Sequence, residues 1–177
     1  KISLKYCSYC QADLIITIPQ GDNRERYTCI ACKTIFYQNP RIIAGCIALY
    51  GSRVLLCRRA IEPRKGYWTL PAGFMENGES TIEAAQRETW EEALAKADIS
   101  SLFSVCNIPS LNQVHLFYLA TLLQPEFGVG AESLEVELFS EIDIPWTDLS
   151  FSTVKQSLQR FFHDRKTGQQ LLHHIDL

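Results

Sequence analysis

The segment Gly73–Ala95 constrains the fold most, because it joins a glycine-containing loop to a strongly helical sequence. Ser80 and Glu83 have the spacing of a capping box, which predicts that a helix begins near Thr81. The sequence that follows is rich in alanine and lacks Gly and Pro as far as about Lys96. The sequence therefore predicts a stable helix placed directly after a loop.

One face of this predicted helix carries three carboxylates, those of Glu88, Glu91 and Glu92. At about 100° per residue, they fall within about one third of the helix circumference. Like charges at these spacings each destabilise a helix by about 0.2–0.5 kcal/mol, and no lysine follows them at a spacing that would relieve the repulsion. Crowded carboxylates without partners are what a hard cation such as Mg²⁺ or Mn²⁺ requires. The alternative is an acidic face that contacts only water.

The loop and the helix together follow a pattern of fixed spacing: Gly, five residues, Glu, seven residues, Arg-Glu, two residues, Glu-Glu. Its positions in this chain are Gly73, Glu79, Arg87, Glu88, Glu91 and Glu92. The segment resembles the Nudix box, and these fixed offsets favour a metal site over a solvated acidic face. The resemblance implies an α/β fold, the Nudix α/β/α sandwich with a mixed sheet. It also implies a hydrolase that cleaves diphosphate bonds with the help of a divalent metal.

The resemblance further implies a role for each box residue. The three glutamates on the helix face would bind metal, which bridges diphosphate oxygens and activates a water. In the family, the backbone carbonyl beside the box glycine also binds metal, which implicates Ala72 or Gly73. Glu79 and Arg87 are expected to form a structural ion pair that holds the loop to the helix.

Residues outside the box are also candidates for the site. Some family members use a glutamate outside the box as general base, and Glu132 and Glu135 are the candidates here; an ordinary glutamate at a strand edge is the alternative. The acidic chain must also hold an anionic substrate. Arginines upstream of the box could bind its negative charge, and aromatic residues that flank the box could stack on its rings. The candidate substrate contacts are Arg58, Arg59, Tyr67, Phe74 and Gln113.

The chain departs from the family pattern where the helix should end. Leu94 stands where the family has a glycine. Glycine ends helices readily because it tolerates the left-handed conformation, and leucine tolerates that conformation poorly. We therefore expect the helix to continue for a few residues, toward Asp98.

Four cysteines near the start of the chain have the spacing of a second, different metal site. They form two C-x2-C pairs separated by eighteen residues, which suits tetrahedral Zn²⁺ in a zinc ribbon over residues 1–38. Disulfides and a redox motif are the alternatives, but nothing in the sequence resembles a signal peptide, and a redox motif explains one pair only. The predicted zinc ligands are Cys7, Cys10, Cys29 and Cys32, and the remaining cysteines, expected in the core, are Cys46, Cys57 and Cys106.

The rest of the chain, residues 39–177, is long enough for one full core, which would hold the Nudix hydrolase domain. Apolar segments predict strands at about 42–50, 54–57, 114–123 and 134–139, with a hairpin turn at Gly51-Ser52. Apolar residues at helical spacing predict an amphipathic helix at about 151–166. The end of the chain resembles a tail or an interface strand.

Composition limits the partners and the location of the protein. The net charge of −3 and the pI near 5.8 argue against non-specific binding of nucleic acid. No apolar run reaches the length of a membrane span, so we expect no membrane partner and a cytoplasmic location. Because residue 1 is Lys rather than Met, we also expect the native chain to begin further upstream.

The resemblance extends beyond the box to most of the chain. Segments such as Tyr37-Gln-Asn-Pro-Arg-Ile and Gly66-Tyr-Trp-Thr-Leu-Pro-Ala-Gly-Phe are similar to the zinc-ribbon subgroup of Nudix hydrolases, with plant-type FAD pyrophosphatases the most similar. NADH pyrophosphatases of this subgroup carry a Ser-Gln-Pro-Trp-Pro-Phe-Pro segment after the box, which is absent here. The resemblance therefore implies hydrolysis of a small-molecule dinucleotide, with FAD cleaved to FMN and AMP as the leading reaction.

Other functions stay open from the sequence. NADH or ADP-ribose hydrolysis is the alternative within the enzyme class. A Nudix-like ligand sensor fused to a zinc-ribbon binding module is the alternative of another class, although a sensor has no need of all three glutamates. Family analogy also suggests a homodimer.

Overall fold

The computed structural model describes residues 4–177, which divide into two compact units between Pro40 and Arg41. The smaller unit contains one three-stranded antiparallel sheet in the order β1-β2-β3. Its strands are β1 (Leu14–Thr17), β2 (Arg26–Cys29) and β3 (Ile35–Phe36). Such a small sheet buries little apolar surface, so the unit depends on another source of stability.

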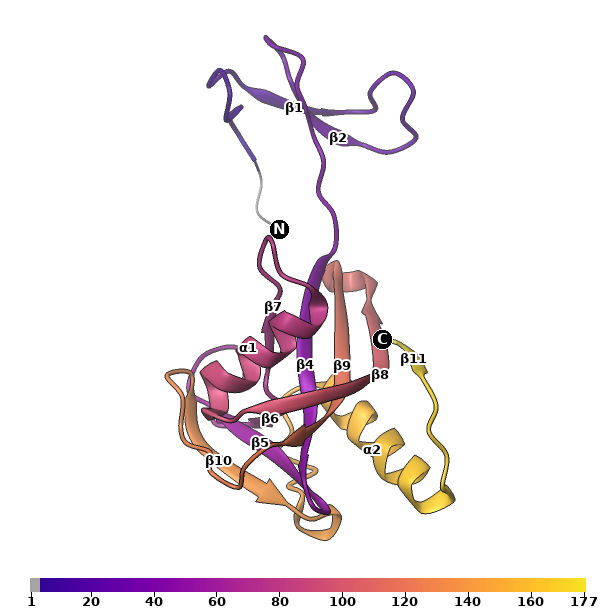
Figure 1. The fold of residues 1–177 in the computed structure, drawn as a ribbon. Coiled ribbons are helices and arrows are strands. Elements are labelled where there is room, and N and C mark those ends of the chain that lie inside the picture. The colour runs from indigo at the N-terminus through magenta and orange to yellow at the C-terminus, as the bar shows by residue number, and fades with distance from the viewer. Residues whose placement is uncertain (1–3) are drawn as a thin grey trace. The chain divides into compact units, whose positions relative to one another are not determined.

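The larger unit is built on a mixed sheet in the order β10-β5-β4-β9-β8-β11 (Figure 1). The pairs β4–β9 and β8–β11 are parallel, and the other neighbours along this order are antiparallel. Two short strands extend the sheet, since β6 pairs with β5 and β7 pairs with β4. The bounds are β4 (Arg41–Tyr50), β5 (Arg53–Arg59), β6 (Trp68–Thr69), β7 (Ala72–Phe74), β8 (Ala97–Ile108), β9 (Gln113–Leu122), β10 (Ser133–Phe139) and β11 (His173–Asp176).

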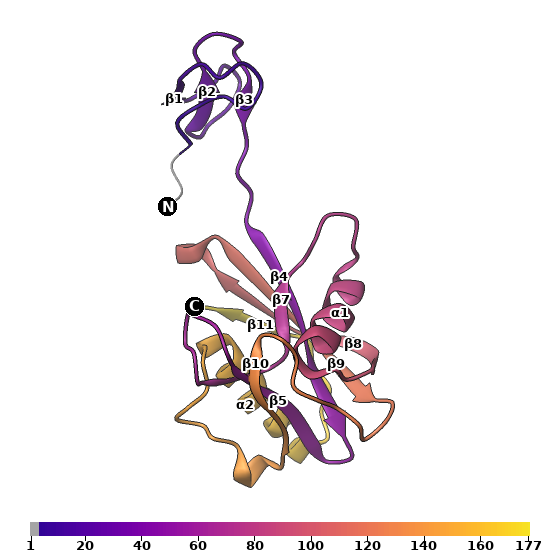
Figure 2. The ribbon, with the colours of Figure 1, turned by 90° about the vertical axis from the view of Figure 1, so that its left-hand side faces the viewer.

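Two helices, α1 (Thr81–Ala93) and α2 (Ser152–Thr167), cover opposite faces of this sheet (Figures 1 and 2). Successive side chains of β4 explain the arrangement, because a strand points them alternately to its two faces. Ala44 and Cys46 pack in the core cluster that contains α1, and Ile47 packs in the cluster that contains α2. The predicted α/β/α sandwich with a mixed sheet is therefore confirmed. The short 3-10 turn η1 (Pro109–Leu111) connects β8 to β9, and η2 (Glu141–Asp143) lies between β10 and α2.

The prediction that the first helix continues toward Asp98 is wrong. Helix α1 ends at Ala93, and Leu94 adopts the left-handed conformation with φ of 48°. The loop after β9 compensates for this conformation, because Gly128 N–H donates to the Ala93 carbonyl (2.7 Å). The residues that follow then pair with β9 as strand β8, which a longer helix would prevent.

Of the two alternatives for the end of the chain, a tail or an interface strand, the tail is wrong, because these residues form a strand. Residues His173–Asp176 form β11, which pairs in parallel with β8 as an edge strand of the sheet. Ile175 is buried in the core beneath α2, and His173 hydrogen-bonds to the buried Asp164 of α2 (2.8 Å). In residues 4–177, neither helix has the length and apolarity that spanning a membrane requires.

Candidate active site and cysteine cluster

The capping box places the start of α1. Ser80 Oγ accepts a hydrogen bond from Glu83 N–H (3.2 Å), and Glu83 Oε2 accepts one from Ser80 N–H (2.7 Å). The reciprocal pair satisfies two of the free amides at the helix start. A hydrogen bond between Thr81 Oγ1 and the hydroxyl of Tyr118 (2.6 Å) then fixes this first turn to β9.

Arg87 joins the preceding loop to the acidic face of α1. Its Nε and Nη2 donate to the two oxygens of Glu79 (2.5 and 3.0 Å), and Nη2 also donates to the Phe74 carbonyl (3.0 Å). Hydrogen bonds from Arg87 lower the pKa of Glu79 to about 2, so Glu79 is charged under ordinary conditions. Arg87 Nη1 reaches Glu88 (2.7 Å) and Glu91 (3.1 Å), so one guanidinium organises the loop and two carboxylates.

Glu92 is the most buried carboxylate of the cluster, with 6% of its surface exposed. The pKa of Glu92 is raised to about 8, first by burial and then by the charge of Glu88. A hydrogen bond from the Ala72 backbone and the charge of Arg59 lower this pKa but do not cancel the rise. Among the described residues, Glu92 Oε2 is buried and has no hydrogen-bond partner. A buried carboxylate oxygen without a donor is costly unless a cation or proton binds it.

Glu88 packs directly against the box glycine. A Cβ on Gly73 would lie 2.3 Å from Glu88 Oε2, so a side chain at residue 73 would force the Glu88 carboxylate to move. Burial raises the pKa of Glu88, Arg87 opposes that effect, and the charges of Glu91 and Glu132 add to it. Residue 73 therefore lets strand β7 lie against the carboxylates of α1.

A glycine loop that the sequence analysis missed brings another glutamate to this cluster. Gly130 N–H donates to the Glu92 carbonyl (3.0 Å), and a Cβ on Gly130 would lie 1.8 Å from the Glu91 carbonyl oxygen. Two residues later, the Glu132 carbonyl accepts from Ala60 N–H (2.8 Å), which ties the loop to the end of β5. The sequence feature that could have indicated this contact is the pair of glycines in Gly128-Val-Gly130, because glycine permits a close approach of two backbones.

The two candidate bases lie in different surroundings. Glu132 is close enough to the acidic cluster for its charge to raise the pKa of both Glu88 and Glu92. Glu135 instead forms an ion pair with Arg58 (3.0 Å), and both side chains are about half-exposed. A register shift between Ser133 and Glu135 in the β10–β5 pairing separates the two glutamates.

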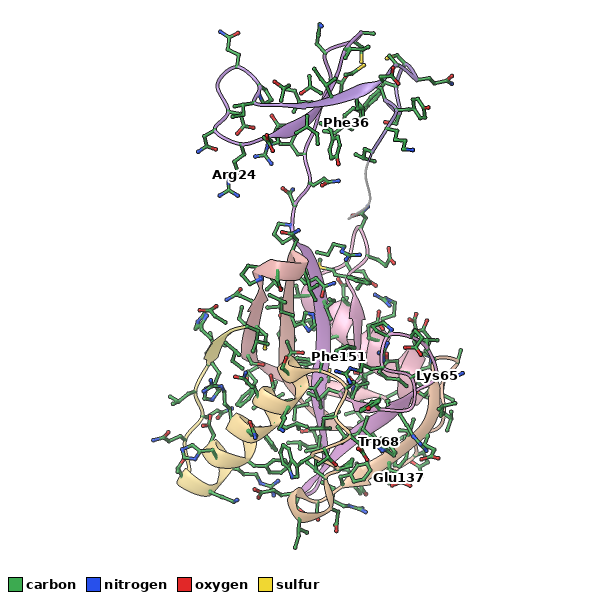
Figure 3. The ribbon with its side chains drawn as sticks, turned by 180° about the vertical axis from the view of Figure 1, so that it is seen from behind. Arg24, Phe36, Lys65, Trp68, Glu137 and Phe151 are labelled. Carbon is green, nitrogen blue, oxygen red and sulfur yellow. The ribbon has the colours of Figure 1, made fainter. Side chains whose placement is uncertain are left out.

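The candidate substrate contacts fall into two groups. The guanidinium carbon of Arg59 lies 5.1 Å from the centroid of the Phe151 ring. Phe151 packs on the α2 side of the sheet, as does Trp68 (Figure 3). Tyr67 is stacked in the same way by Arg64, at 5.2 Å. Arg59 ends β5, and Arg64 belongs to the turn that follows this strand. Arg59 lies near enough to Glu92 to affect its pKa, so it borders the carboxylate cluster.

The second group lies farther along the sheet. Phe74 is 44% exposed directly after Gly73, and the guanidinium of Arg41 stacks over its ring (4.7 Å). Gln113 begins β9, which is separated from β7 by β4. The structure therefore places Phe74 beside the box and Gln113 two strands away.

The carboxylate cluster fits a hard divalent cation. Its donors are all oxygens, Glu92 is buried and Glu88 is partly buried, and Glu92 Oε2 lacks a donor among the described residues. Oxygen-only donor sets of this charge suit Mg²⁺ or Mn²⁺. Glu91 is 55% exposed and turned toward Arg87, so the buried part of the cluster is formed by Glu88 and Glu92.

The smaller unit brings its four predicted cysteine ligands together. Their Sγ atoms lie within 4.8 Å of one another, with Cys7–Cys32 at 3.6 Å and Cys10–Cys29 at 3.4 Å. The residue after each pair, Gln11 or Lys33, has a positive φ, so the two turns share one geometry. This arrangement of four sulfurs suits a tetrahedral metal.

The remaining cysteines lie in the core of the larger unit, as predicted. Cys46, Cys57 and Cys106 are each at most 1% exposed. Burial raises the pKa of all three thiols, to about 11 for Cys46. These thiols therefore stay protonated and serve in packing.

Comparisons with known proteins agree with this geometry. Residues 39–162 match the NUDIX domain family, and residues 5–38 match the zinc-ribbon family described as Nudix N-terminal. A solved NUDIX hydrolase from Nitrosomonas europaea is 46% identical with a TM-score of 0.95, and the match covers 98% of this chain and 99% of that one.

Two curated relatives match over shorter stretches. An ADP-ribose pyrophosphatase from Methanocaldococcus jannaschii is 28% identical over 62% of this chain and 67% of its own length. A NAD-capped RNA hydrolase NudC from Chromobacterium violaceum is 34% identical over 53% of this chain, and the match spans only 34% of that protein. The family matches cover most of the chain, and they coincide with the box and the cysteine cluster. The chain therefore belongs to the Nudix hydrolase family and carries the family's N-terminal zinc ribbon.

Proposed function

We propose that this protein is a metal-dependent pyrophosphohydrolase that cleaves a nucleoside diphosphate linked to another group. FAD, cleaved to FMN and AMP, is the leading substrate, and NADH and ADP-ribose are the alternatives. The observation that carries the proposal is the buried Glu92, whose Oε2 lacks a partner among the described residues and faces the same cluster as Glu88. The names of the two curated relatives, an ADP-ribose pyrophosphatase and a NAD-capped RNA hydrolase, support a diphosphate substrate.

The chain's own oxygens would hold the cation. Carboxylates of Glu88, Glu91 and Glu92 supply the negative charge, and the backbone carbonyl of Ala72 or Gly73 supplies a neutral oxygen at the strand that contacts them. Bound Mg²⁺ or Mn²⁺ would neutralise diphosphate charge and lower the pKa of a bound water. Glu79 and Arg87 act structurally, because their ion pair holds the loop against α1.

The reaction consumes one water. Its oxygen forms a new bond to one phosphorus, the bond from that phosphorus to the bridging oxygen breaks, and the bridging oxygen leaves on the other phosphate. We assign the acceptor of the water proton to Glu132, because its charge acts on Glu88 and Glu92. Glu135 is engaged by Arg58 instead, so we do not assign it this role.

The basic side chains bordering the cluster would hold the substrate's negative charge. Arg59 is the best placed, since it stacks on Phe151 and lies near Glu92. Arg58 is oriented by Gly66 and Glu135, and Tyr67 lies under Arg64, so these residues would shape the rim. Positioning and charge stabilisation are the main demands of phosphoryl transfer.

The cysteine cluster would hold a structural Zn²⁺ rather than take part in the chemistry. All four positions of a tetrahedral site are supplied by the chain, so no position is left for a substrate. The homodimer and the cytoplasmic location stay predictions from the sequence.

A panel of FAD, NADH, ADP-ribose and nucleoside triphosphates, each with Mg²⁺ or Mn²⁺, tests the proposal. We expect turnover of at least one dinucleotide, with products identified by chromatography. If the folded, zinc-loaded protein binds these compounds but hydrolyses none of them, the sensor is the better description. The intact set of three box glutamates favours the enzyme.

A further inference from the structure

A groove of about 570 Å³ lies between α2 and β11, on the face of the sheet opposite α1. Every side chain that lines it is polar or charged, from Ser152 to Asp164 on α2 and His173 on β11. Strand β11 lies at one end of the sheet, whereas β10 and β5, which border the carboxylate cluster, lie at the other (Figure 1). The groove is therefore separate from the candidate active site.

Two rows of side chains on α2 form the groove, because residues four apart lie above one another on a helix. Ser152, Gln156 and Arg160 form one row at this spacing. Lys155, Gln159 and His163 form the adjacent row at the same spacing. Each row thus brings hydrogen-bond donors and one permanent cation to the same surface.

The two cations of the groove, Lys155 and Arg160, have no acidic partner. Within residues 4–177, neither side chain takes part in an ion pair. The chain as a whole carries a net charge of −3, so unpaired cations are not what its composition favours. The groove is therefore a positively charged site on an acidic protein.

Arg160 also has a donor that lacks an acceptor. Its Nε is buried and has no hydrogen-bond partner among the described residues. The guanidinium lies near the core, since burial raises the pKa of the Cys106 thiol and the charge of Arg160 acts in the opposite direction. A guanidinium cannot lose its proton to avoid this cost. A turn of the fork toward the groove would place Nε and one Nη on a single oxyanion.

The one carboxylate of the groove, Asp164, does not neutralise these cations. It is 4% exposed, and its Oδ2 accepts from His173 (2.8 Å) and from Leu171 N–H (3.4 Å). Burial acts to raise the pKa of Asp164, but these hydrogen bonds lower it below the usual value, so the group is charged. Asp164 thus ties β11 to α2 and forms the wall of the groove.

The start of α2 adds to the positive potential at one end of the groove. Phe151 is the N-cap and supplies no side-chain hydrogen bond, and Ser152, the first helical residue, lines the groove. Free amides and the helix dipole favour an anion at this position. The helix start and the unpaired guanidinium of Arg160 therefore favour the same sign of ligand.

The lining selects for a ligand with several charged oxygens. Two cations and the amides of Gln156 and Gln159 offer many donors, and the absence of apolar lining gives an aliphatic or aromatic body nothing to pack on. We infer that this groove is a second anion-binding site, which takes a phosphate group on the side of the sheet away from the carboxylate cluster. The inference does not depend on the proposed function.

The test uses the full-length, zinc-loaded protein without added Mg²⁺ or Mn²⁺, so that the acidic cluster repels anions. Inorganic phosphate and AMP are the probes, measured by calorimetry and by thermal unfolding. We expect binding at one site, a higher midpoint of unfolding, and weaker binding as NaCl is raised. AMP that binds about 10-fold or more tightly than phosphate would identify a nucleotide as the ligand; equal affinities would identify the phosphate group alone.

Arg160→Gln should weaken phosphate binding about 10-fold or more, because it removes the charged fork. Arg160→Lys, which keeps the charge, should restore part of the affinity. Lys155→Glu reverses a charge at an exposed position, so it tests the site even if Arg160→Gln fails to fold, and should weaken binding about 10-fold or more. Lys166→Gln, at an exposed cation of α2 outside the groove, should change binding less than about 2-fold.

Hydrolysis of dinucleotides with Mg²⁺ should change less than about 3-fold in Lys155→Glu, because the groove and the carboxylates lie on opposite faces. A parallel loss of hydrolysis would overturn the claim of a separate site. Phosphate binding that is absent in wild type, unchanged in both Lys155→Glu and Arg160→Gln, or weakened as much by Lys166→Gln would overturn the inference. Each of these binding results would leave the proposed function intact.

Discussion

Gly130 lies so close to Glu91 that a methyl group on its α-carbon would stand 1.8 Å from the Glu91 carbonyl oxygen. The contact belongs to a loop that also donates from Gly130 N–H to the Glu92 carbonyl. This loop therefore holds the segment that carries Glu132 against the last turn of α1. The close approach of two backbones thus positions a side chain for the proposed chemistry.

The first prediction concerns this contact. Gly130→Ala should lower the free energy of unfolding by about 1–3 kcal/mol, because the loop must move away from α1. It should also lower kcat about 100-fold by displacing Glu132. Gly128→Ala is the control, since its added methyl would meet only the flexible end of Leu94 (3.1 Å). Equal effects of the two variants on kcat would contradict this account.

The second prediction distinguishes the two candidate bases. Glu132→Gln should lower kcat about 100-fold or more, the range expected for loss of a general base. Glu135→Gln should change kcat less than about 3-fold, because that carboxylate pairs with Arg58 at a half-exposed site. Steady-state kinetics across pH 6–9 would measure both variants. A larger loss for Glu135→Gln would reverse the assignment.

The third prediction concerns the cysteine cluster. Purified protein should contain about one zinc per chain, and Cys29→Ser should lose nearly all of it, because four sulfurs complete the site. The smaller unit should then unfold, since its three-stranded sheet buries too little surface to fold unaided. Elemental analysis and hydrogen exchange would report both effects. Cys46→Ala, in the core of the larger unit, should keep its zinc.

The fourth prediction is a pH dependence of stability. Burial lowers the pKa of His115 to about 4 from its usual value near 6.5, so between these values the unfolded chain binds the proton more tightly. The contribution of neutral His115 to the free energy of unfolding is therefore fully present above pH 6.5. It is lost as the pH falls toward 4, by at most about 3 kcal/mol. Urea unfolding of wild type and His115→Phe at pH 7.5 and 5.0 measures it. An identical pH slope in both proteins would contradict the assignment.

Local sequence patterns were sufficient for some elements and insufficient for others. The capping box at Ser80 fixed the start of α1, because its hydrogen bonds involve only residues near one another in the chain. The end of α1 depends on Gly128, more than thirty residues later, so Leu94 adopts a conformation that its own propensity disfavours. Strand β11 depends on pairing with β8, which four residues of sequence cannot indicate.

The site shows the same division between local and distant effects. The box spacing placed the glutamates on one face, because helical geometry follows from sequence separation alone. The difference between Glu132 and Glu135 arises from a register shift in the β10–β5 pairing, which no spacing rule predicts.

The central claim is that the carboxylates of α1 bind the metal that cleaves a diphosphate. The most direct measurement compares dinucleotide hydrolysis and Mn²⁺ binding in wild type, Glu92→Gln and Glu137→Gln. Glu137 is an exposed glutamate of β10, visible in Figure 3, and serves as the matched control. We predict metal-dependent turnover in wild type and Glu137→Gln, and a loss of about 100-fold or more together with weakened Mn²⁺ binding in Glu92→Gln. Turnover and Mn²⁺ binding that are unchanged in Glu92→Gln would contradict the claim.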